Sequence, residues 1–198
     1  FFRPVYVQSS VMDIDMASSN AHLWSVGTSS TNQRFIIERV DINGALPLNF
    51  GSSFTAKIAL QSTGKYLVNQ NGNIAAAVAG DTFTFVRNGN GTYKIRAADG
   101  RNMDACGAVF SNGTNIQLWE NNTSPAQQFY ICYTNNAYYI KPFYGQTAVF
   151  DVDSATQNLQ LYAYGTGDAS LNAQRMNIVI DRPADDSVPI TAINASQY

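Results

Sequence analysis

The residues best suited to chemistry lie in the stretch NIQLWENNTSPAQQFYI, residues 115–131. Gln117 stands two residues before Trp119, and Gln127 stands two residues before Phe129. An aromatic face can stack on the C–H face of a sugar ring, while amide side chains can exchange hydrogen bonds with its hydroxyl groups. The same residues could equally pack the two strands of a hairpin. The stretch by itself leaves both interpretations open.

The composition indicates a folded chain with little charge. Of its 198 residues, 45% are hydrophobic and 12% are aromatic, which argues against disorder. Charged residues make up 13% and the formal net charge is −2, so we expect no nucleic acid partner. No apolar run approaches the roughly 18 residues that a membrane-spanning helix needs, so we expect no membrane insertion. No basic and apolar leader opens the sequence, and we expect any signal peptide to have been removed already or to lie outside it.

Residues with catalytic or metal-binding potential are sparse. The chain has one histidine, no nucleophile elbow, no phosphate-binding loop and no cluster of metal ligands. Asp13 with Asp15, and Asp151 with Asp153, each share one face of a strand, as a glycosidase acid and base could. We favour one sugar-binding carboxylate and one turn acceptor in each pair, and expect no enzyme, no metal and no cofactor.

Two cysteines, Cys106 and Cys132, make no metal motif. They could form one disulfide bond or stay as buried thiols, and the sequence leaves both open.

Short strand-like segments run through the whole chain. YKIRA, AYYIKPF, AVFDVD and QRFIIERV are rich in β-branched and aromatic residues, and the turn signals NGNG, ADG and SNG separate such segments. No segment shows a capped apolar stripe with a period of 3.6 residues. The pattern predicts an all-β barrel or sandwich.

The sequence repeats itself. Residues 2–28 align without a gap with residues 140–166, an offset of 138, and Asp13 meets Asp151 in that alignment. A shorter period lies within the long one, because GRNMDACGAVFSNGTNIQLW carries the same order of Asp and Gln-apolar-aromatic residues. The spacing predicts units of about 45 residues. We expect four of them, at 1–42, 52–92, 93–135 and 136–182.

These units resemble the ricin-type β-trefoil lectins and the related carbohydrate-binding modules. The QxW repeat of that family would correspond to Gln33-Arg34-Phe35, Gln127-Gln128-Phe129 and Gln174-Arg175-Met176. The resemblance covers most of residues 1–182, and it implies a β-trefoil in which three units close a barrel and its cap. It also implies that Phe35, Phe129 and Met176 belong to the core.

The resemblance further implies a domain organisation. We expect three units to close one trefoil, with a linker before it and a linker or tail after it, at 52–182, 43–51 and 183–198. We then expect the unit at 1–42 to be an additional trefoil unit, the last member of a preceding trefoil. A competing frame closes the first three units and leaves the fourth over. Either way, a lone unit buries too little surface to fold alone and must be completed by another copy.

The same resemblance implies the roles of the side chains. The Asp accepts hydrogen bonds from sugar hydroxyls, the aromatic residue is the stacking platform, and the amides complete the site. We expect sites in units one, three and four, formed by Asp13, His22, Trp24, Asn32 and Gln33; by Asp104, Gln117, Trp119 and Gln127; and by Asp151, Gln160, Tyr162 and Gln174. Unit two carries Leu67 in place of the Asp and Ala77 in place of the aromatic residue, so we expect it to bind no sugar.

The expected function is a secreted, non-catalytic, lectin-like module that binds glycans weakly and multivalently. The family resemblance implies galactose or N-acetylgalactosamine as the first ligands to test, and the unpaired first unit implies self-association. One alternative is an extracellular structural or assembly protein made of trefoil repeats. Another is the targeting module of a larger toxin or glycoside hydrolase.

Overall fold

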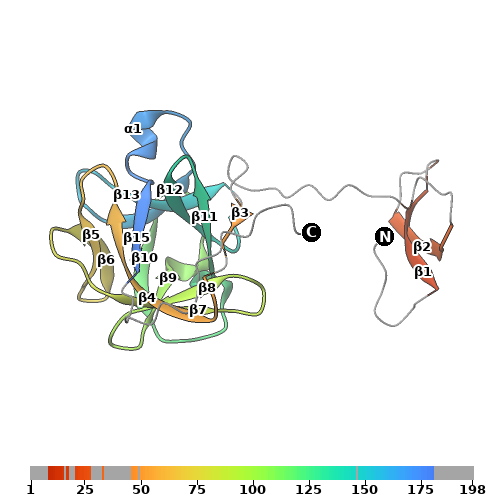
Figure 1. Ribbon diagram of the computed structural model, residues 1–198, viewed down its shortest axis with the longest axis horizontal. Coiled ribbons are helices and arrows are strands. Elements are labelled where there is room, and N and C mark those ends of the chain that lie inside the picture. Colours follow the sequence, from red (N-terminus) through yellow and green to blue (C-terminus); the bar gives the residue numbers. More distant parts are fainter. Residues whose placement is uncertain are drawn as a thin grey trace. The chain divides into compact units, whose positions relative to one another are not determined.

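The protein consists mainly of short antiparallel strands (Figure 1). The structure, a computed structural model, describes residues 9–15, 17, 21–27, 33, 46–48, 50–145 and 147–180. The chain divides into two compact units, Phe1–Val40 and Asp41–Tyr198. Each unit is considered separately below.

The first unit contains a hairpin of two strands, β1 (Ser10–Ile14) and β2 (Ala21–Ser25). In β1, Val11 and Asp13 are buried while Met12 between them is exposed, as the alternation of a strand requires. The short β1–β2 connection carries a turn in which the Asp15 carboxylate accepts a hydrogen bond of 3.0 Å from the Ala17 amide. Phe35, which we expected in the core, lies outside the described residues.

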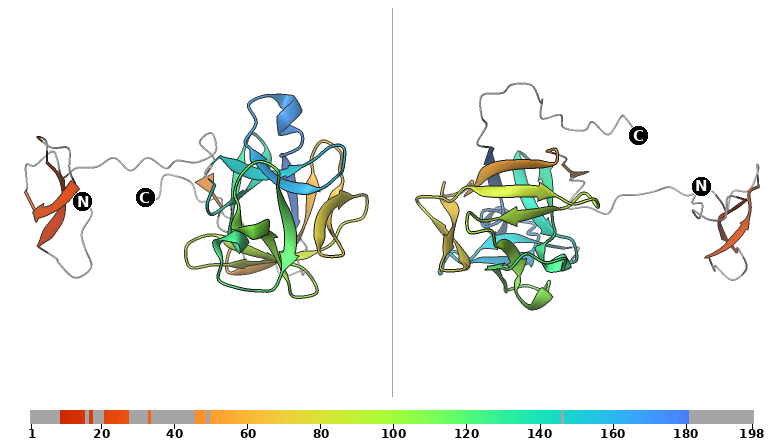
Figure 2. Two further views of the ribbon diagram at one scale, coloured as in Figure 1. Left: turned by 180° about the vertical axis from the view of Figure 1, so that it is seen from behind. Right: turned by 90° about the horizontal axis from the view of Figure 1, so that it is seen from below.

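The second unit is a 13-stranded sheet with three short helical segments. Its strands are β3 (Leu46–Pro47), β4 (Ser53–Leu60), β5 (Tyr66–Gln70), β6 (Asn73–Ala77), β7 (Phe83–Arg87), β8 (Tyr93–Arg96), β9 (Asn102–Ala105), β10 (Thr114–Trp119), β11 (Phe129–Thr134), β12 (Ala137–Pro142), β13 (Ala148–Val152), β14 (Leu159–Ala163) and β15 (Met176–Ile180). The helical segments are η1 (Cys106–Ala108), η2 (Pro125–Gln127) and α1 (Asp168–Leu171), and α1 stands out from the trefoil in blue (Figure 2).

The strands close a barrel and leave three hairpins beside it. Successive antiparallel pairings run from β4 through β7, β8, β11, β12 and β15 and return to β4, where Ile178 faces Ile58. The remaining hairpins are β5–β6, β9–β10 and β13–β14, and they join one another through β10 and through the Ala75–Asn158 bridge. A closed barrel with a cap of hairpins is the architecture of a β-trefoil.

Left-handed residues form the tight turns. Asn71 and Gly72 join β5 to β6 with φ values of 55° and 94°, and Asn135 and Asn136 join β11 to β12 with φ values of 49° and 58°. Two consecutive residues with positive φ form the turn whose twist matches paired strands, and Asn and Gly adopt it most readily. The Asn- and Gly-rich segments of the sequence therefore form tight turns between paired strands.

Three asparagine side chains close a ring of hydrogen bonds in the cap. Asn115 Nδ2 donates to Asn73 Oδ1 at 3.0 Å, Asn158 Nδ2 donates to Asn115 Oδ1 at 2.9 Å, and Asn73 Nδ2 donates to Asn158 Oδ1 at 2.8 Å. The spacings along the chain are 42 residues from Asn73 to Asn115 and 43 residues from Asn115 to Asn158. Each hairpin thus supplies one equivalent amide, and each amide both gives and receives one bond.

The core lies inside the barrel and beneath the cap. Phe129 and Met176, which the family resemblance places in the core, are both fully buried, and Phe129 meets Phe150 edge to face with ring centroids 5.0 Å apart. Burying rings of this size dominates the stability of such a core.

Part of the segment expected as a linker packs on the trefoil. Strand β3 pairs with β11, the Leu48 amide donates to the Ile131 carbonyl at 2.7 Å, and the Phe50 amide donates to the Tyr93 hydroxyl at 2.8 Å. Residues 46–48 and Phe50 are therefore anchored rather than free to swing. The other expected boundaries stay predictions.

The two cysteines lie in different surroundings. Cys106 is exposed on η1, whereas Cys132 is buried in β11, and no disulfide bond joins them in the described part of the chain. None of the helices formed by the described residues is long and apolar enough to cross a membrane.

Candidate functional site

Three hairpins share one arrangement across their strands. In each, an aspartate faces a residue that can donate a hydrogen bond, and the residue two positions before that aspartate faces an exposed aromatic ring. The facing pairs are Asp13 with His22 and Val11 with Trp24; Asp104 with Gln117 and Asn102 with Trp119; and Asp151 with Gln160 and Val149 with Tyr162. The structure therefore brings the expected carboxylate, donor and aromatic residue together within each hairpin.

In the β9–β10 hairpin, a buried amide orients the carboxylate. Gln127 Nε2 donates to Asp104 Oδ2 at 3.1 Å and to the Glu120 carbonyl at 2.9 Å. Its Oε1 accepts from the Asn122 amide and from Asn102 Nδ2, both at 3.2 Å. Gln127 is fully buried, so its side chain lies behind the carboxylate and not beside the exposed ring. The Gln127 side chain therefore makes all its hydrogen bonds to other groups of the protein.

The end of a short helix places this amide. Ser124 caps η2 by accepting a hydrogen bond of 3.2 Å from the Ala126 amide, and Pro125 begins the turn. Serine caps and a proline at the first position are both typical of helix starts. Gln127, the last residue of the turn, thereby points inward to Asp104.

The β13–β14 hairpin repeats this pattern. Gln174 Nε2 donates to Asp151 Oδ2 at 3.0 Å and to the Ala163 carbonyl at 2.9 Å, while its Oε1 accepts from the Gly165 amide at 2.9 Å. Gln160 Nε2, on the facing strand, donates to Asp151 Oδ1 at 3.2 Å. Both oxygens of this carboxylate are thus held in place by amide groups.

The first unit carries a corresponding set. Gln33 Nε2 donates to the Ser25 carbonyl at 2.9 Å and its Oε1 accepts from the Gly27 amide at 2.8 Å, as Gln174 does with the carbonyl and amide 138 positions later. His22 Nε2 lies 3.0 Å from Asp13 Oδ2, in the place that Gln160 takes beside its own aspartate. Asn32, expected in the same site, lies outside the described residues.

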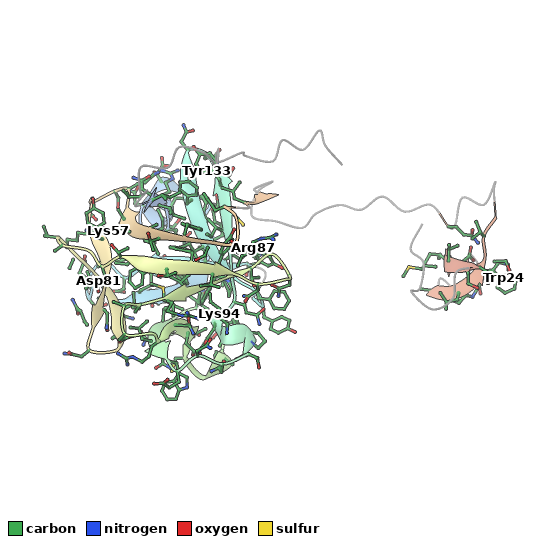
Figure 3. The ribbon with its side chains drawn as sticks, turned by 60° about the horizontal axis from the view of Figure 1, so that its bottom comes forward. Trp24, Lys57, Asp81, Arg87, Lys94 and Tyr133 are labelled. Carbon is green, nitrogen blue, oxygen red and sulfur yellow. The ribbon has the colours of Figure 1, made fainter. Side chains whose placement is uncertain are left out.

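The aromatic rings are open to solvent while the neighbouring carboxylates are not. Trp24, Trp119 and Tyr162 are 62%, 54% and 44% exposed. Figure 3 shows Trp24 at the edge of its hairpin, and its ring stacks on His22 with centroids 5.5 Å apart. A large exposed ring beside a mostly buried carboxylate offers a ligand both an apolar face and a polar anchor.

The β5–β6 hairpin differs, and one expectation about it is wrong. Tyr66 faces Ala77 as Asn102 faces Trp119, so the residue two positions after Tyr66 takes the place of the aspartate. That residue is Val68, not Leu67 as we expected. Leu67 is fully buried in the core, because neighbouring residues of a strand point to opposite faces.

The structure agrees with the rest of the expectation for this hairpin. Ala77 stands in the position of the aromatic residue, and Ala75 faces Val68 where the other hairpins place a polar donor. The described part of this hairpin therefore offers neither a carboxylate nor a ring at these positions.

Burial raises the pKa values of the Asp104 and Asp151 carboxyl groups. For Asp104 the loss of hydration raises the pKa, and hydrogen bonds from Gln127 and then Gln117 lower it in part. For Asp151 burial again raises the pKa most, against the hydrogen bonds from Gln160 and Gln174. A partly dehydrated carboxylate gains more from a new hydroxyl donor than one that is fully hydrated.

The second aspartate of the Asp151–Asp153 pair serves the turn. Asp153 Oδ1 accepts from the Ala155 amide at 3.0 Å, from the Thr156 amide at 2.7 Å and from the Thr156 hydroxyl at 2.8 Å. The bonds from Thr156 hold the pKa of Asp153 below its ordinary value. This is the turn role expected for it, and it makes the residue a poor proton donor. Among the described residues, no group of three or more potential ligands could hold a metal ion.

One pocket lies beside the β13–β14 hairpin. It has a volume of about 710 Å³ and includes Asp151, Gln160 and Tyr162 in its lining. Residues of the β4–β5 turn, distant in sequence, line it as well. Sequence reasoning missed that turn, because no motif marks a contact between different units.

Comparisons with known proteins support the same resemblance. Residues 79–163 match the family model described as ricin-type beta-trefoil lectin domain-like. The designed threefold-symmetric protein ThreeFoil is similar in structure, with 23% identity, a TM-score of 0.55, and 63% of this chain and 97% of that chain covered. The resemblance to ricin-type β-trefoil lectins and the all-β trefoil fold are therefore confirmed.

Larger proteins contain similar folds. The Polyporus squamosus lectin, solved with a sialylated epitope, has 18% identity and a TM-score of 0.56, over 66% of this chain and 50% of that chain. A mosquitocidal holotoxin has 16% identity and a TM-score of 0.58, over 89% of this chain and 22% of that chain. No curated protein matches the sequence. At these identities the likeness concerns the fold, and the ligand has to be argued from the site.

Proposed function

We propose that this protein is a non-catalytic carbohydrate-binding module whose sites are the hairpins of Asp104, Asp151 and Asp13. The observation that carries the proposal is the repeated grouping of a mostly buried carboxylate, an adjacent donor and an exposed aromatic ring. The family match over residues 79–163 supports it, because that family is lectin-like. We propose in addition that the module is secreted, because glycans displayed on cell surfaces lie outside the cell.

The carboxylate, the donor and the aromatic ring are complementary to the polar edge and the apolar face of a sugar. The carboxylate accepts hydrogen bonds from a pair of hydroxyl groups, and the ring covers the opposite C–H face. Buried glutamines hold the carboxylates of Asp104 and Asp151, so little side-chain entropy is lost when a sugar binds. Galactose and N-acetylgalactosamine, which carry both a C–H face and vicinal hydroxyls, are the first ligands to test.

Binding at one hairpin is weak in this proposal. A shallow site makes few contacts, so we expect dissociation constants on the order of millimolar to tens of micromolar. Several such sites on one chain raise the apparent affinity for a surface bearing many glycans. Repetition of the unit is therefore part of the function.

Isosteric removal of the charge tests the proposal. Asp104→Asn and Asp151→Asn keep the side-chain shape, and each should abolish sugar-induced chemical-shift changes at its own hairpin. Asp99→Asn is the matched control, because Asp99 is exposed and its carboxylate pairs with Arg101. If a variant with Asn in place of Asp13, Asp104 and Asp151 binds sugar as the wild type does, the carbohydrate-binding proposal is refuted.

Self-association is a second candidate, suggested by the first unit. Three apolar side chains of its described part, Leu23, Trp24 and Val26, are 54%, 62% and 39% exposed. Exposed apolar residues in succession favour burial against a partner. The repeat at an offset of 138 makes another trefoil copy the natural partner, because both segments suit the same position in a barrel.

Targeting is a third candidate. Similar folds occupy 22% of a mosquitocidal holotoxin and 33% of an endo-β-galactosidase from Clostridium perfringens. A module of this kind would bring a larger toxin or glycoside hydrolase to its glycan. Glycan-binding measurements on the present chain test the part that this proposal shares with the first.

A further inference from the structure

The pocket beside Asp151 is larger than a site for one sugar requires. Its volume is about 710 Å³. Pockets of roughly 300–1,000 Å³ enclose drug-sized ligands, which are larger than a single hexose. Its lining includes Asp151 and Tyr162, and the β4–β5 turn contributes Ser62, Thr63 and Lys65. The lining is thus shared between the β13–β14 hairpin and the β4–β5 turn, which are far apart in sequence.

Lys65 supplies hydrogen-bond donors to this region. Its Nζ donates to Gln157 Oε1 at 2.8 Å, which uses one of the three donors of an ammonium group. The ion pairs within the described part of the chain do not include Lys65. Its charge therefore has no carboxylate partner there, and its remaining donors suit oxygen acceptors of a ligand.

Gln157 is held in an unusual conformation beside this lysine. Its φ is 62°, in the left-handed region that side chains other than Gly, Asn and Asp rarely adopt. The Ala76 amide donates to the Gln157 carbonyl at 2.8 Å, and Lys65 holds its side chain. Contacts from the β4–β6 region thus fix a residue of the β13–β14 turn, and such fixed conformations recur at binding sites.

The walls of the pocket are tied together before any ligand binds. Ser62 Oγ donates to the Asn172 carbonyl at 2.8 Å, which joins the β4–β5 turn to the segment after α1. A Cβ on Gly165 would lie 2.2 Å from Ser170 Oγ, so only glycine allows α1 to pack this closely. Walls that are already ordered lose little entropy on binding.

We infer that this pocket binds a disaccharide or a longer glycan, with one sugar between Asp151 and Tyr162 and the next against Lys65 and the β4–β5 turn. This inference rests on the proposed function, because Asp151 and Tyr162 orient the first sugar. The second sugar presents a hydroxyl or carboxylate oxygen to the Lys65 ammonium. The site therefore distinguishes glycans by their second residue.

The test compares matched pairs of sugars. The probes are methyl β-galactoside with lactose, methyl β-glucoside with cellobiose, and methyl N-acetyl-β-glucosaminide with chitobiose. Nuclear magnetic resonance titration of the Gln160 and Tyr162 signals reports this pocket separately from the other hairpins. For the pair that binds, the disaccharide should bind about tenfold more tightly, as one added charge-assisted hydrogen bond allows.

Two variants locate the second sugar. Lys65→Met keeps the length of the side chain but removes its donors, and it should abolish the advantage of the disaccharide while leaving the monosaccharide affinity unchanged. Lys57→Met is the control, since Lys57 lies over the Tyr66 ring and is not among the residues that line the pocket. If Lys65→Met fails to fold, Thr63→Val offers a second, conservative change in the same turn.

The outcomes separate the two proposals. Equal affinity for the two sugars of every binding pair, or an advantage that persists in Lys65→Met and Thr63→Val, overturns the extended site and leaves monosaccharide binding standing. No response of Gln160 and Tyr162 to any probe overturns the extended site and the assignment of a sugar site to the Asp151 hairpin, while the signals of the Asp104 and Asp13 hairpins test the proposed function separately. A disaccharide advantage lost in Lys65→Met and kept in Lys57→Met supports the inference.

Discussion

Gln127 Nε2 donates a hydrogen bond of 3.1 Å to Asp104 Oδ2, and the same amide nitrogen donates at 2.9 Å to the Glu120 carbonyl. One buried side chain therefore fixes the carboxylate and the end of the loop behind it. This double role makes the residue important for stability as well as for the site.

Gln127→Ala should lower the free energy of unfolding by about 1–3 kcal/mol, because buried polar groups lose their partners. Sugar-induced shifts at Trp119 should also weaken, because Asp104 is no longer oriented. Denaturant unfolding and sugar titration measure the two effects. Gln128→Ala is the matched control, because the neighbouring Gln128 bonds to exposed groups at Asn90 and Thr123. Equal losses in the two variants would contradict the assignment.

Trp119→Ala should reduce binding at the β9–β10 hairpin without unfolding the protein, because the ring is 54% exposed. Trp119→Tyr should retain part of the affinity, since a smaller face covers less of the sugar. Calorimetric titration orders the three proteins. Val109→Ala, which alters another exposed apolar residue, is the control. An alanine variant that binds as the wild type does would show that this ring only caps its hairpin.

Acid should weaken sugar binding at a higher pH than an ordinary aspartate would predict. Burial raises the pKa values of Asp104 and Asp151 above 3.8, so their acceptor carboxylates are lost as the pH falls through these raised values. Folding stability from these groups has the opposite sign: it is fully present below the unfolded pKa and is lost as the pH rises through the folded pKa. Titration of the carboxyl resonances measures the two pKa values, and sugar titrations and denaturant unfolding at several pH values measure the binding and the stability.

The comparison group for this titration is Asp99. Hydrogen bonds from Arg101 hold its pKa below the ordinary value, so its resonance should titrate at lower pH than that of Asp104. A midpoint for Asp104 at or below that of Asp99 would contradict the role given to burial.

Asn115→Ala should destabilise the cap by roughly 1–2 kcal/mol, since it removes the donor to Asn73 Oδ1 and one of the two acceptors of Asn158 Nδ2, which keeps its bond to the Leu159 carbonyl. Denaturant unfolding measures the loss. Asn177→Ala, an exposed change on β15, serves as the control and should have a smaller effect. A neutral Asn115→Ala variant would show that water replaces the amide ring without cost.

Removal of residues 1–42 tests self-association and keeps the anchoring contacts of residues 46–48. If the first unit is completed by another copy, the full chain should form multimers and the shortened chain should be monomeric. Light scattering at several concentrations compares their masses, and sugar titration checks that the trefoil remains intact. A monomer in both cases would count against the self-association proposal.

Much of the fold could be predicted because the repeats are encoded locally. The recurring Asp and aromatic positions, and turn signals such as NGNG, mark hairpins from short-range sequence alone. The family resemblance placed Phe129 and Met176 in the core, where both are buried. It also grouped Asp104 with Gln117, and the register of their hairpin makes these two residues face each other.

What could not be predicted depends on contacts between distant segments or on register. Leu67 was mistaken for the aspartate position because a shift of one residue changes the face of a strand, and no polar residue marks the right place in β5. Lys65 and Gln157 are separated by 92 residues in the sequence, and no repeat or motif predicts their contact. The sugar-binding candidates Gln127 and Gln174 have the expected partners, but their burial behind the carboxylates became visible only in three dimensions.

The ring of Asn73, Asn115 and Asn158 has no first or last member, and the barrel shares this property, because Ile180 of β15 faces Ala56 of β4. The order of the chain is therefore separable from the architecture. A circular permutant that joins residue 180 to residue 53 through a short linker and opens the chain between Asn135 and Asn136 would preserve the strand pairings of the barrel. The trefoil is thus a cyclic object, and its present starting point is one of several that the same packing allows.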